Sequence, residues 1–176
     1  KAQAIEIQRS AEQATIQAEK MAESEVHARQ ETFLRIARHV SAQLGSVGGF
    51  LFLSSQGAGV GPVSPDEMSK LFAQQAAQDP ELFSRRLLEI HVQLADPDQQ
   101  HALFYGTPTR ARHSNNFIVT FERLMQRAEA VDTDFIIRDA LLATGHGLVY
   151  RLAKRHQGLA PAHLADPAQT GTHIDF

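Results

Sequence analysis

Residues 1–44 have the sequence KAQAIEIQRSAEQATIQAEKMAESEVHARQETFLRIARHVSAQL, and this stretch decides the fold. It contains no proline and no glycine, and it is dominated by Ala, Glu, Gln, Ile and Arg. These residues are strong helix formers whose preferences add over a window of this length. The sequence therefore predicts an all-α protein, in which a long, coiled-coil-like N-terminal helix over residues 1–44 precedes a compact bundle of about five helices.

An apolar line along the first half of this helix has the spacing of a coiled-coil seam. Its members follow alternating steps of four and three residues: Ile7, Ala11, Ala14, Ala18 and Met21. The same register then reaches Glu25, where the apolar line shifts by one residue. Because most of the seam is alanine, this part of the helix has too little apolar bulk to form a stable structure without a partner. We therefore expect these five residues to bind a protein partner or a second copy of the chain, with the extended helix joining the bundle near residue 30.

Residues 45–63 are expected to form a glycine-rich, uncharged linker. Six glycines fall between Gly45 and Gly61, and no charged residue occurs from residue 40 through residue 65. Glycine at this density stops or loosens a helix. The linker also holds the apolar run Phe50, Leu51, Phe52 and Leu53. We expect this run to bind a partner, since exposed apolar clusters generally mark contacts. The alternative is that the run packs against its own bundle.

Residues 64–156 are expected to form the helical bundle. Three helix starts share a capping side chain followed by proline, at Ser64-Pro65, Asp79-Pro80 and Asp96-Pro97. They predict helices near residues 65–77, 80–95 and 97–105. Thr107-Pro108 then leads into a strongly amphipathic helix that runs to about Ala130 and carries the stripe Phe117, Phe121, Leu124, Met125 and Ala128.

The last predicted helix covers residues 134–156 and is interrupted by Gly145-His146-Gly147. Glycine in a helix interior costs roughly 1 kcal/mol, so either the backbone is crowded at this point or the helix breaks. Residues 157–176 hold Pro161 and Pro167 and are expected to form an irregular C-terminal tail.

The sequence contains no arrangement of residues that is typical of an active site. It has no cysteine, and its nine histidines include neither the His-x-x-x-His spacing of a zinc site nor a Glu-x-x-His pair. We therefore expect a protein that is not an enzyme and that holds no metal or cofactor. His146 is the one histidine that we consider as a possible ligand contact, because glycines on both sides allow a backbone or a small ligand to approach it.

A second candidate contact site is the polar, basic segment that contains Arg110, Arg112 and His113. With the other basic residues between positions 110 and 155, it could bind the phosphates of a nucleic acid or of anionic lipids. The favoured role of Arg110 and Arg112 is instead to pair with acids of a neighbouring helix or with a partner protein. A net charge of −3 and a pI of about 6.3 argue against general polyanion binding, so we do not expect nucleic acid as a partner.

These features favour an interaction protein, such as an accessory or scaffold subunit of a larger assembly. Thirteen arginines against four lysines, with abundant alanine, are typical of GC-rich bacterial genomes. No run of 18 apolar residues is present, but an anchor upstream of Lys1 would tether the protein, so we expect a cytoplasmic or membrane-tethered bacterial component. The alternative is a regulatory or sensor module that binds a small ligand near His146.

Overall fold

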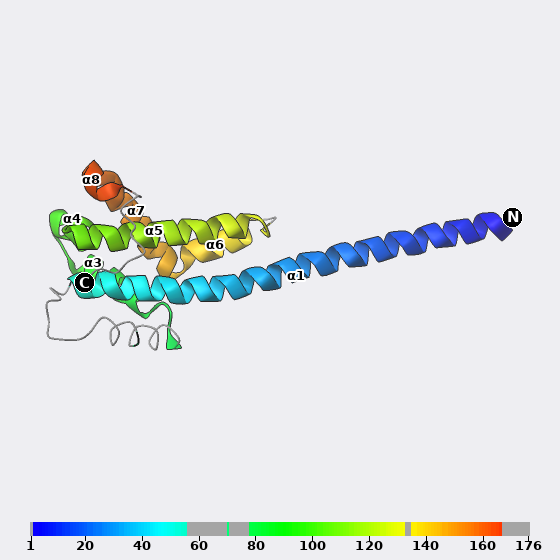
Figure 1. Ribbon diagram of the computed structural model, residues 1–176, viewed down its shortest axis with the longest axis horizontal. Helices are drawn as coiled ribbons and strands as arrows, with labels where there is room; N and C mark the ends of the chain where they lie inside the picture. The colour runs from blue at the N-terminus through cyan, green and yellow to red at the C-terminus, as the bar shows by residue number, and fades with distance from the viewer. Residues whose placement is uncertain (1, 56–69, 71–77, 133–134, 167–176) are drawn as a thin grey trace. The chain divides into compact units, whose positions relative to one another are not determined.

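The computed structural model describes residues 2–55, 70, 78–132 and 135–166 (Figure 1). Within these ranges the chain forms seven helices and no strand. The predicted all-α fold, with a long N-terminal helix followed by a cluster of shorter helices, is confirmed. The helix predicted near residues 65–77 and the second part of the predicted linker lie outside the described residues, apart from Lys70.

The N-terminal helix α1 runs from Ala2 to Ser55, so its predicted end at residue 44 is wrong. It continues through Gly45, Gly48 and Gly49 because apolar residues around these glycines are buried. Leu44, Val47 and Leu51 follow steps of three and four residues and lie in the core. Burying one such side chain contributes about 1.5–3 kcal/mol, which outweighs the cost of about 1 kcal/mol for each helical glycine. Residues 45–55 are therefore a core helix and not a linker.

The chain divides into two units, Lys1–Ile36 and Ala37–Phe176. The boundary falls beyond residue 30, the junction that the sequence analysis expected. In the first unit, every residue from Ala2 to Arg29 is exposed. In the second unit, the end of α1 and the shorter helices share one apolar core.

The helices of the second unit begin close to their predicted starts. α3 covers Leu82–Gln93, α4 covers Pro97–Tyr105 and α5 covers Pro108–Glu129. The side chain of Asp96 accepts a hydrogen bond from the backbone N–H of Asp98, and that of Thr107 accepts one from Arg110. These caps satisfy N–H groups that have no partner within their helices, and they explain why proline directly follows each capping residue.

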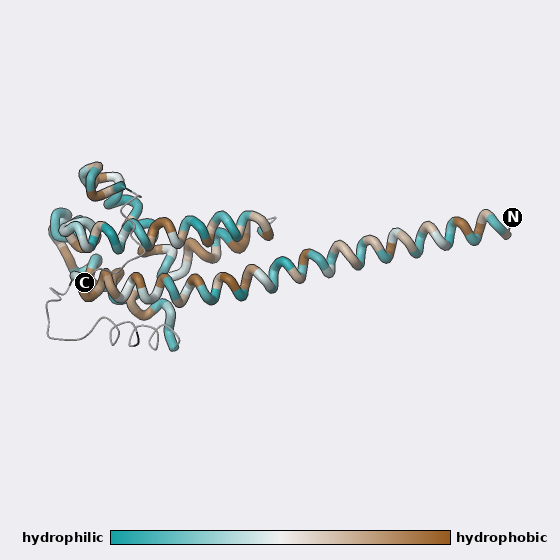
Figure 2. The backbone as a smooth tube through the Cα atoms, in the orientation of Figure 1, coloured by the Kyte–Doolittle hydropathy of each residue, from teal (hydrophilic) through white to brown (hydrophobic). Residues whose placement is uncertain are grey.

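Helix α5 lies at the centre of the core and contacts α4, α6, α7 and α8. Phe117, Ile118 and Phe121 are fully buried on it, and the ring of Phe121 stacks on Tyr150 at a centroid distance of 4.7 Å. Polar and apolar residues alternate along α5 with the helical repeat (Figure 2). The predicted amphipathic stripe is therefore the buried face of this helix.

The helix predicted over residues 134–156 is two helices, α6 over Ile136–Ala143 and α7 over Gly145–Leu159. Between them Thr144 has an extended backbone, and its side chain accepts a hydrogen bond from the N–H of Gly147. The backbone is also crowded there. A Cβ atom on Gly147 would overlap the carbonyl oxygens of Leu141 and Leu142. Gly147 therefore allows α6 and α7 to meet at a sharp break.

The C-terminal tail is more regular than expected as far as Asp166. Helix α7 continues past residue 157 to Leu159, and the short helix α8 covers Ala162–Ala165. Pro161 separates them because proline has no backbone N–H to continue the hydrogen bonds of α7. The expectation of an irregular tail was wrong for residues 157–159 and 162–165, and residues 167–176 lie outside the described part of the chain.

Candidate functional site

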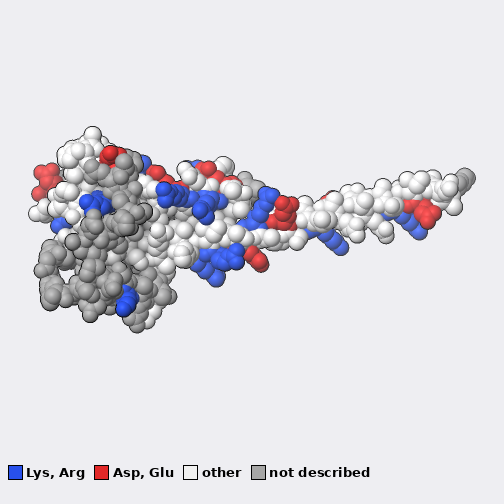
Figure 3. Space-filling model, viewed as in Figure 1, with Lys and Arg blue, Asp and Glu red and all other residues white. Residues whose placement is uncertain are grey.

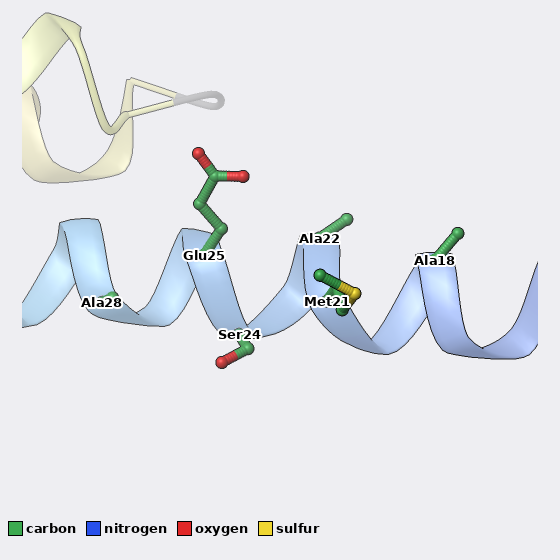
Figure 4. Close-up of a pocket in the computed structure, with 6 residues that line it drawn as sticks. All are labelled: Ala18, Met21, Ala22, Ser24, Glu25 and Ala28. Atoms are coloured by element: carbon green, nitrogen blue, oxygen red, sulfur yellow. The ribbon is translucent and has the colours of Figure 1, made fainter.

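The predicted seam lies along one face of the exposed N-terminal part of α1. Ile7 is 70% exposed and Met21 is 75% exposed, values that are high for large apolar side chains. Ala11, Ala14 and Ala18 lie between them on the same face and are exposed as well. Figure 4 shows Met21 beside Ala18 and Ala22, where the helix surface forms an open hollow that Ser24, Glu25 and Ala28 also line.

The face of α1 that carries Ile7 has no charged side chain before Glu25. With 3.6 residues per turn, six charged residues point at least a quarter turn away from the direction of Ile7: Glu6, Arg9, Glu12, Glu19, Lys20 and Glu23. Figure 3 shows the charged groups of this helix separated by long uncharged surfaces. The seam is thus an exposed apolar strip without charge as far as Glu25. We name the strip that contains Ala4, Ile7, Ala11, Ala14, Ala18 and Met21 the α1 seam.

The other predicted partner-binding residues lie in the bundle. Phe50 and Leu51 are buried, and Phe52 and Leu53 are half-buried. The ring of Phe50 stacks on His113 at 5.7 Å, and that of Phe52 packs at 5.8 Å from Phe83. The expected exposure of this run to a partner is therefore not found, because its side chains pack against their own bundle.

Arg110 binds backbone carbonyl groups and not a neighbouring acid. Its Nη2 donates to the carbonyl oxygen of Ser54 over 3.0 Å, and its Nη1 donates to that of Ala102 over 2.8 Å. The last carbonyls of a helix have no partner within the helix. Arg110 therefore caps the end of α1 and joins it to α4, so its guanidinium binds carbonyl groups of its own chain and not the acid, partner protein or anion that the sequence suggested.

Arg112 and His113 follow on α5, half-buried and buried respectively. Burial first, and then the positive charge of Arg112, lower the pKa of His113 to about 4. His113 is therefore neutral at physiological pH and faces Phe50, so it is a poor partner for an anion.

His146 lies at the centre of a buried polar cluster. Its Nδ1 lies 2.7 Å from the hydroxyl of Ser84 on α3, and its Nε2 lies 3.1 Å from the hydroxyl of Ser41 on α1. Burial lowers the pKa of His146 to about 4, so the neutral ring donates through one nitrogen and accepts through the other. Both nitrogens therefore have partners within the protein, and His146 ties α7 to α1 and α3.

Three further histidines form a line that the sequence analysis missed. Nε2 of His91 lies 3.3 Å from Nε2 of His156, and Nδ1 of His156 lies 3.3 Å from Nδ1 of His101. They come from α3, α7 and α4, so no local spacing in the sequence could indicate them. Burial first, and then the charges of His101, His91 and Arg155, lower the pKa of His156 to about 4.

This histidine line borders a surface hollow of about 440 Å³ that Pro97, Asp98, Gln100 and Leu159 also line, together with His101, Arg155 and His156. The two neighbours of His156 use opposite nitrogens of its ring, so the three imidazoles do not converge on one point. Among the described residues, no group of three or more acidic or histidine side chains is arranged to hold a metal ion.

Asn115 is a second buried polar residue that the sequence did not single out. Its Oδ1 accepts from the hydroxyl of Tyr105 over 2.7 Å and from Gln157 over 3.1 Å, while its Nδ2 donates to the carbonyl of Leu164 over 2.7 Å. One fully buried side chain thereby holds α4, α7 and α8 around α5. Its position on the buried face of an amphipathic helix was the available signal.

In the part of the chain that the structure describes, no helix is both long enough and apolar enough to cross a membrane. The chain matches no protein-family model, no curated protein and no solved structure. The fold and the exposed surface therefore define the class, which is a helical bundle with an extended N-terminal helix that carries an exposed apolar seam.

Proposed function

We propose that this protein is a helical interaction subunit that binds another α-helix along the α1 seam. The observation that carries the proposal is the exposure of Ile7 and Met21 on a strip without charge, within a helix whose first 28 described residues are all exposed. Helices in proteins gain most of their stability from packing an apolar face against another element. A second helix on this strip would supply that packing.

The bundle supports this proposal through what its polar side chains already do. His146 is held between two serines, Arg110 caps helix ends, and Phe50 and Leu51 pack in the core. Of the candidates that the sequence offered in the bundle, Phe50, Phe52, Arg110, His113 and His146 contact rings, hydroxyls or carbonyl groups of the same chain. The α1 seam is the candidate whose side chains remain exposed.

The test compares two substitutions on opposite faces of α1. Ile7→Glu places a charge in the seam, whereas Ile16→Glu places the same charge half a turn away, because nine residues make two and a half helical turns. Both isoleucines are at least half exposed. Tagged chains would be produced in the native cells, and the size of their complexes would be measured by sedimentation.

We expect wild type and Ile16→Glu to sediment in the same complex, and Ile7→Glu to sediment as a smaller particle. Thermal unfolding of the purified variants checks that the bundle is intact. Equal sedimentation of wild type and Ile7→Glu would contradict the proposal, as would a wild-type protein that sediments as a single chain.

A further inference from the structure

We infer that the helix which occupies the α1 seam is the same helix of a second copy, in antiparallel orientation, with residues whose numbers sum to 25 facing each other. This inference rests on the proposed function and names its partner. It places Ile7 opposite Ala18, Met21 opposite Ala4, and Ala11 opposite Ala14. These are the a-to-d contacts of an antiparallel coiled coil.

Charge is the first argument for a second copy. The positions that flank the seam up to residue 24 hold uncharged side chains: Gln3, Gln8, Ser10, Thr15, Gln17, Ala22 and Ser24. Coiled coils that select a different partner commonly do so through charges at these e and g positions. Here two identical helices meet without like charges between them, because the charged side chains lie on the outer faces of both.

Side-chain size is the second argument, and it selects the antiparallel orientation. Four of the six seam residues are alanines, and the two large ones are Ile7 and Met21. Antiparallel pairing puts each large side chain against an alanine, so four of the six layers hold one large and one small side chain and only the two central layers, formed by Ala11 and Ala14, are narrow. Parallel pairing would put Ile7 on Ile7 and Met21 on Met21 and leave alanine layers as gaps between them, which close packing disfavours.

Glu25 supports the same orientation. It lies five helical turns from Ile7, in line with the seam, and a parallel pair would bring the two Glu25 carboxylates together. Like charges facing each other destabilise such a contact. In the antiparallel pair each Glu25 lies beyond the layer that Met21 forms with Ala4 of the second copy, and the two Glu25 carboxylates lie at opposite ends of the paired region. Because an alanine-rich seam buries little apolar area, the dimer should be weak and should dissociate on dilution.

The experiment uses the absence of cysteine in the chain. Ala4→Cys and Met21→Cys are made separately in the full chain, oxidised alone and as an equal mixture, and separated on a non-reducing gel. In the antiparallel pair, equal positions lie about 26 Å apart along the helix, too far for a disulfide, which needs Cα atoms less than about 7 Å apart. We therefore expect cross-linked dimers in the mixture and none from either variant alone.

Cross-linking of each variant with itself would show a parallel pair and overturn the orientation. Sedimentation equilibrium of the purified wild-type chain provides the second measurement. We expect a dimer whose dissociation constant rises at least about tenfold in Ile7→Glu, because a buried unpaired carboxylate is costly, and stays unchanged in Ile16→Glu. A purified chain that stays monomeric would overturn self-association. The proposed function would survive that result if the native complex still depended on Ile7, so the two failures are distinguishable.

Discussion

The hydroxyl of Ser84 on α3 lies 2.7 Å from Nδ1 of His146 on α7, and this contact joins two residues that are 62 positions apart in the chain. The contact is buried, and the other ring nitrogen is held by Ser41. A neutral imidazole fits between two hydroxyls, each of which can donate or accept. A protonated ring would donate through both nitrogens and carry a charge into the core. This relationship makes the stability of the bundle dependent on pH.

We predict that the bundle loses stability as the pH falls below about 6.5. The pKa of His146, His113 and His156 is lowered from 6.5 to about 4 in the folded chain. Between these values the unfolded chain binds more protons than the folded chain, so protons favour unfolding. The contribution is complete above pH 6.5 and is lost progressively toward pH 4. For His146 alone it amounts to roughly 3 kcal/mol at most.

Urea denaturation between pH 8 and pH 4.5 measures this effect, with helix content followed by circular dichroism. The matched control is His146→Gln, which keeps hydrogen-bonding groups but does not titrate. We expect its midpoint to fall less between the two pH values than that of wild type. A wild-type midpoint that is constant, or that rises as the pH falls, would contradict the prediction.

Ser84→Ala should destabilise the bundle by about 1–3 kcal/mol, because it leaves a buried ring nitrogen of His146 without a partner. Ser10→Ala removes a hydroxyl from an exposed position of α1 and serves as the control. The measurement is the free energy of unfolding at pH 7.5. If Ser84→Ala and Ser10→Ala had equal effects, the polar cluster would contribute nothing to stability.

Arg110→Lys should loosen the end of α1 while keeping the positive charge. A lysine ammonium has no planar fork, so it cannot reproduce the bonds that the guanidinium makes to both Ser54 and Ala102. Hydrogen exchange of the backbone in residues 50–55 should therefore speed up, with little change in α7. Unchanged exchange at the end of α1 would show that the hydrogen bonds of Arg110 to Ser54 and Ala102 are dispensable.

The sequence was informative where the signals are local. The capping residues Asp96 and Thr107 placed the starts of α4 and α5, because a cap and the proline after it act within one helical turn. The stripe that contains Phe117 and Phe121 likewise identified a buried face from its spacing alone. Both kinds of signal depend on residues that are neighbours in the chain.

The expectations that failed depend on packing between distant segments. Glycine favours a linker at residues 45–55 by its intrinsic preference, but the burial of Leu44, Val47 and Leu51 keeps α1 helical. Their spacing of three and four residues was visible in the sequence and was outweighed by the glycines. The contact between His91 and His156 joins residues 65 positions apart, and no spacing along one helix could have indicated it.

The two glycines Gly48 and Gly147 should respond oppositely to substitution by alanine. A Cβ atom on Gly48 would lie 3.6 Å from Cβ of Phe83, which is an ordinary contact, whereas one on Gly147 would overlap two carbonyl oxygens. Alanine is favoured over glycine in a helix by up to about 1 kcal/mol. Gly48→Ala should therefore leave the unfolding midpoint unchanged or raise it.

Gly147→Ala should lower the unfolding midpoint, because α6 and α7 must move apart to relieve the overlap. The movement would also weaken the hydrogen bond from the N–H of Gly147 to Thr144, which begins α7. Both variants are compared by thermal unfolding at the same pH, and each serves as the control for the other. Equal midpoints would show that the break at Thr144 does not depend on close approach of the backbone, and that the capping hydroxyl alone is sufficient to form it.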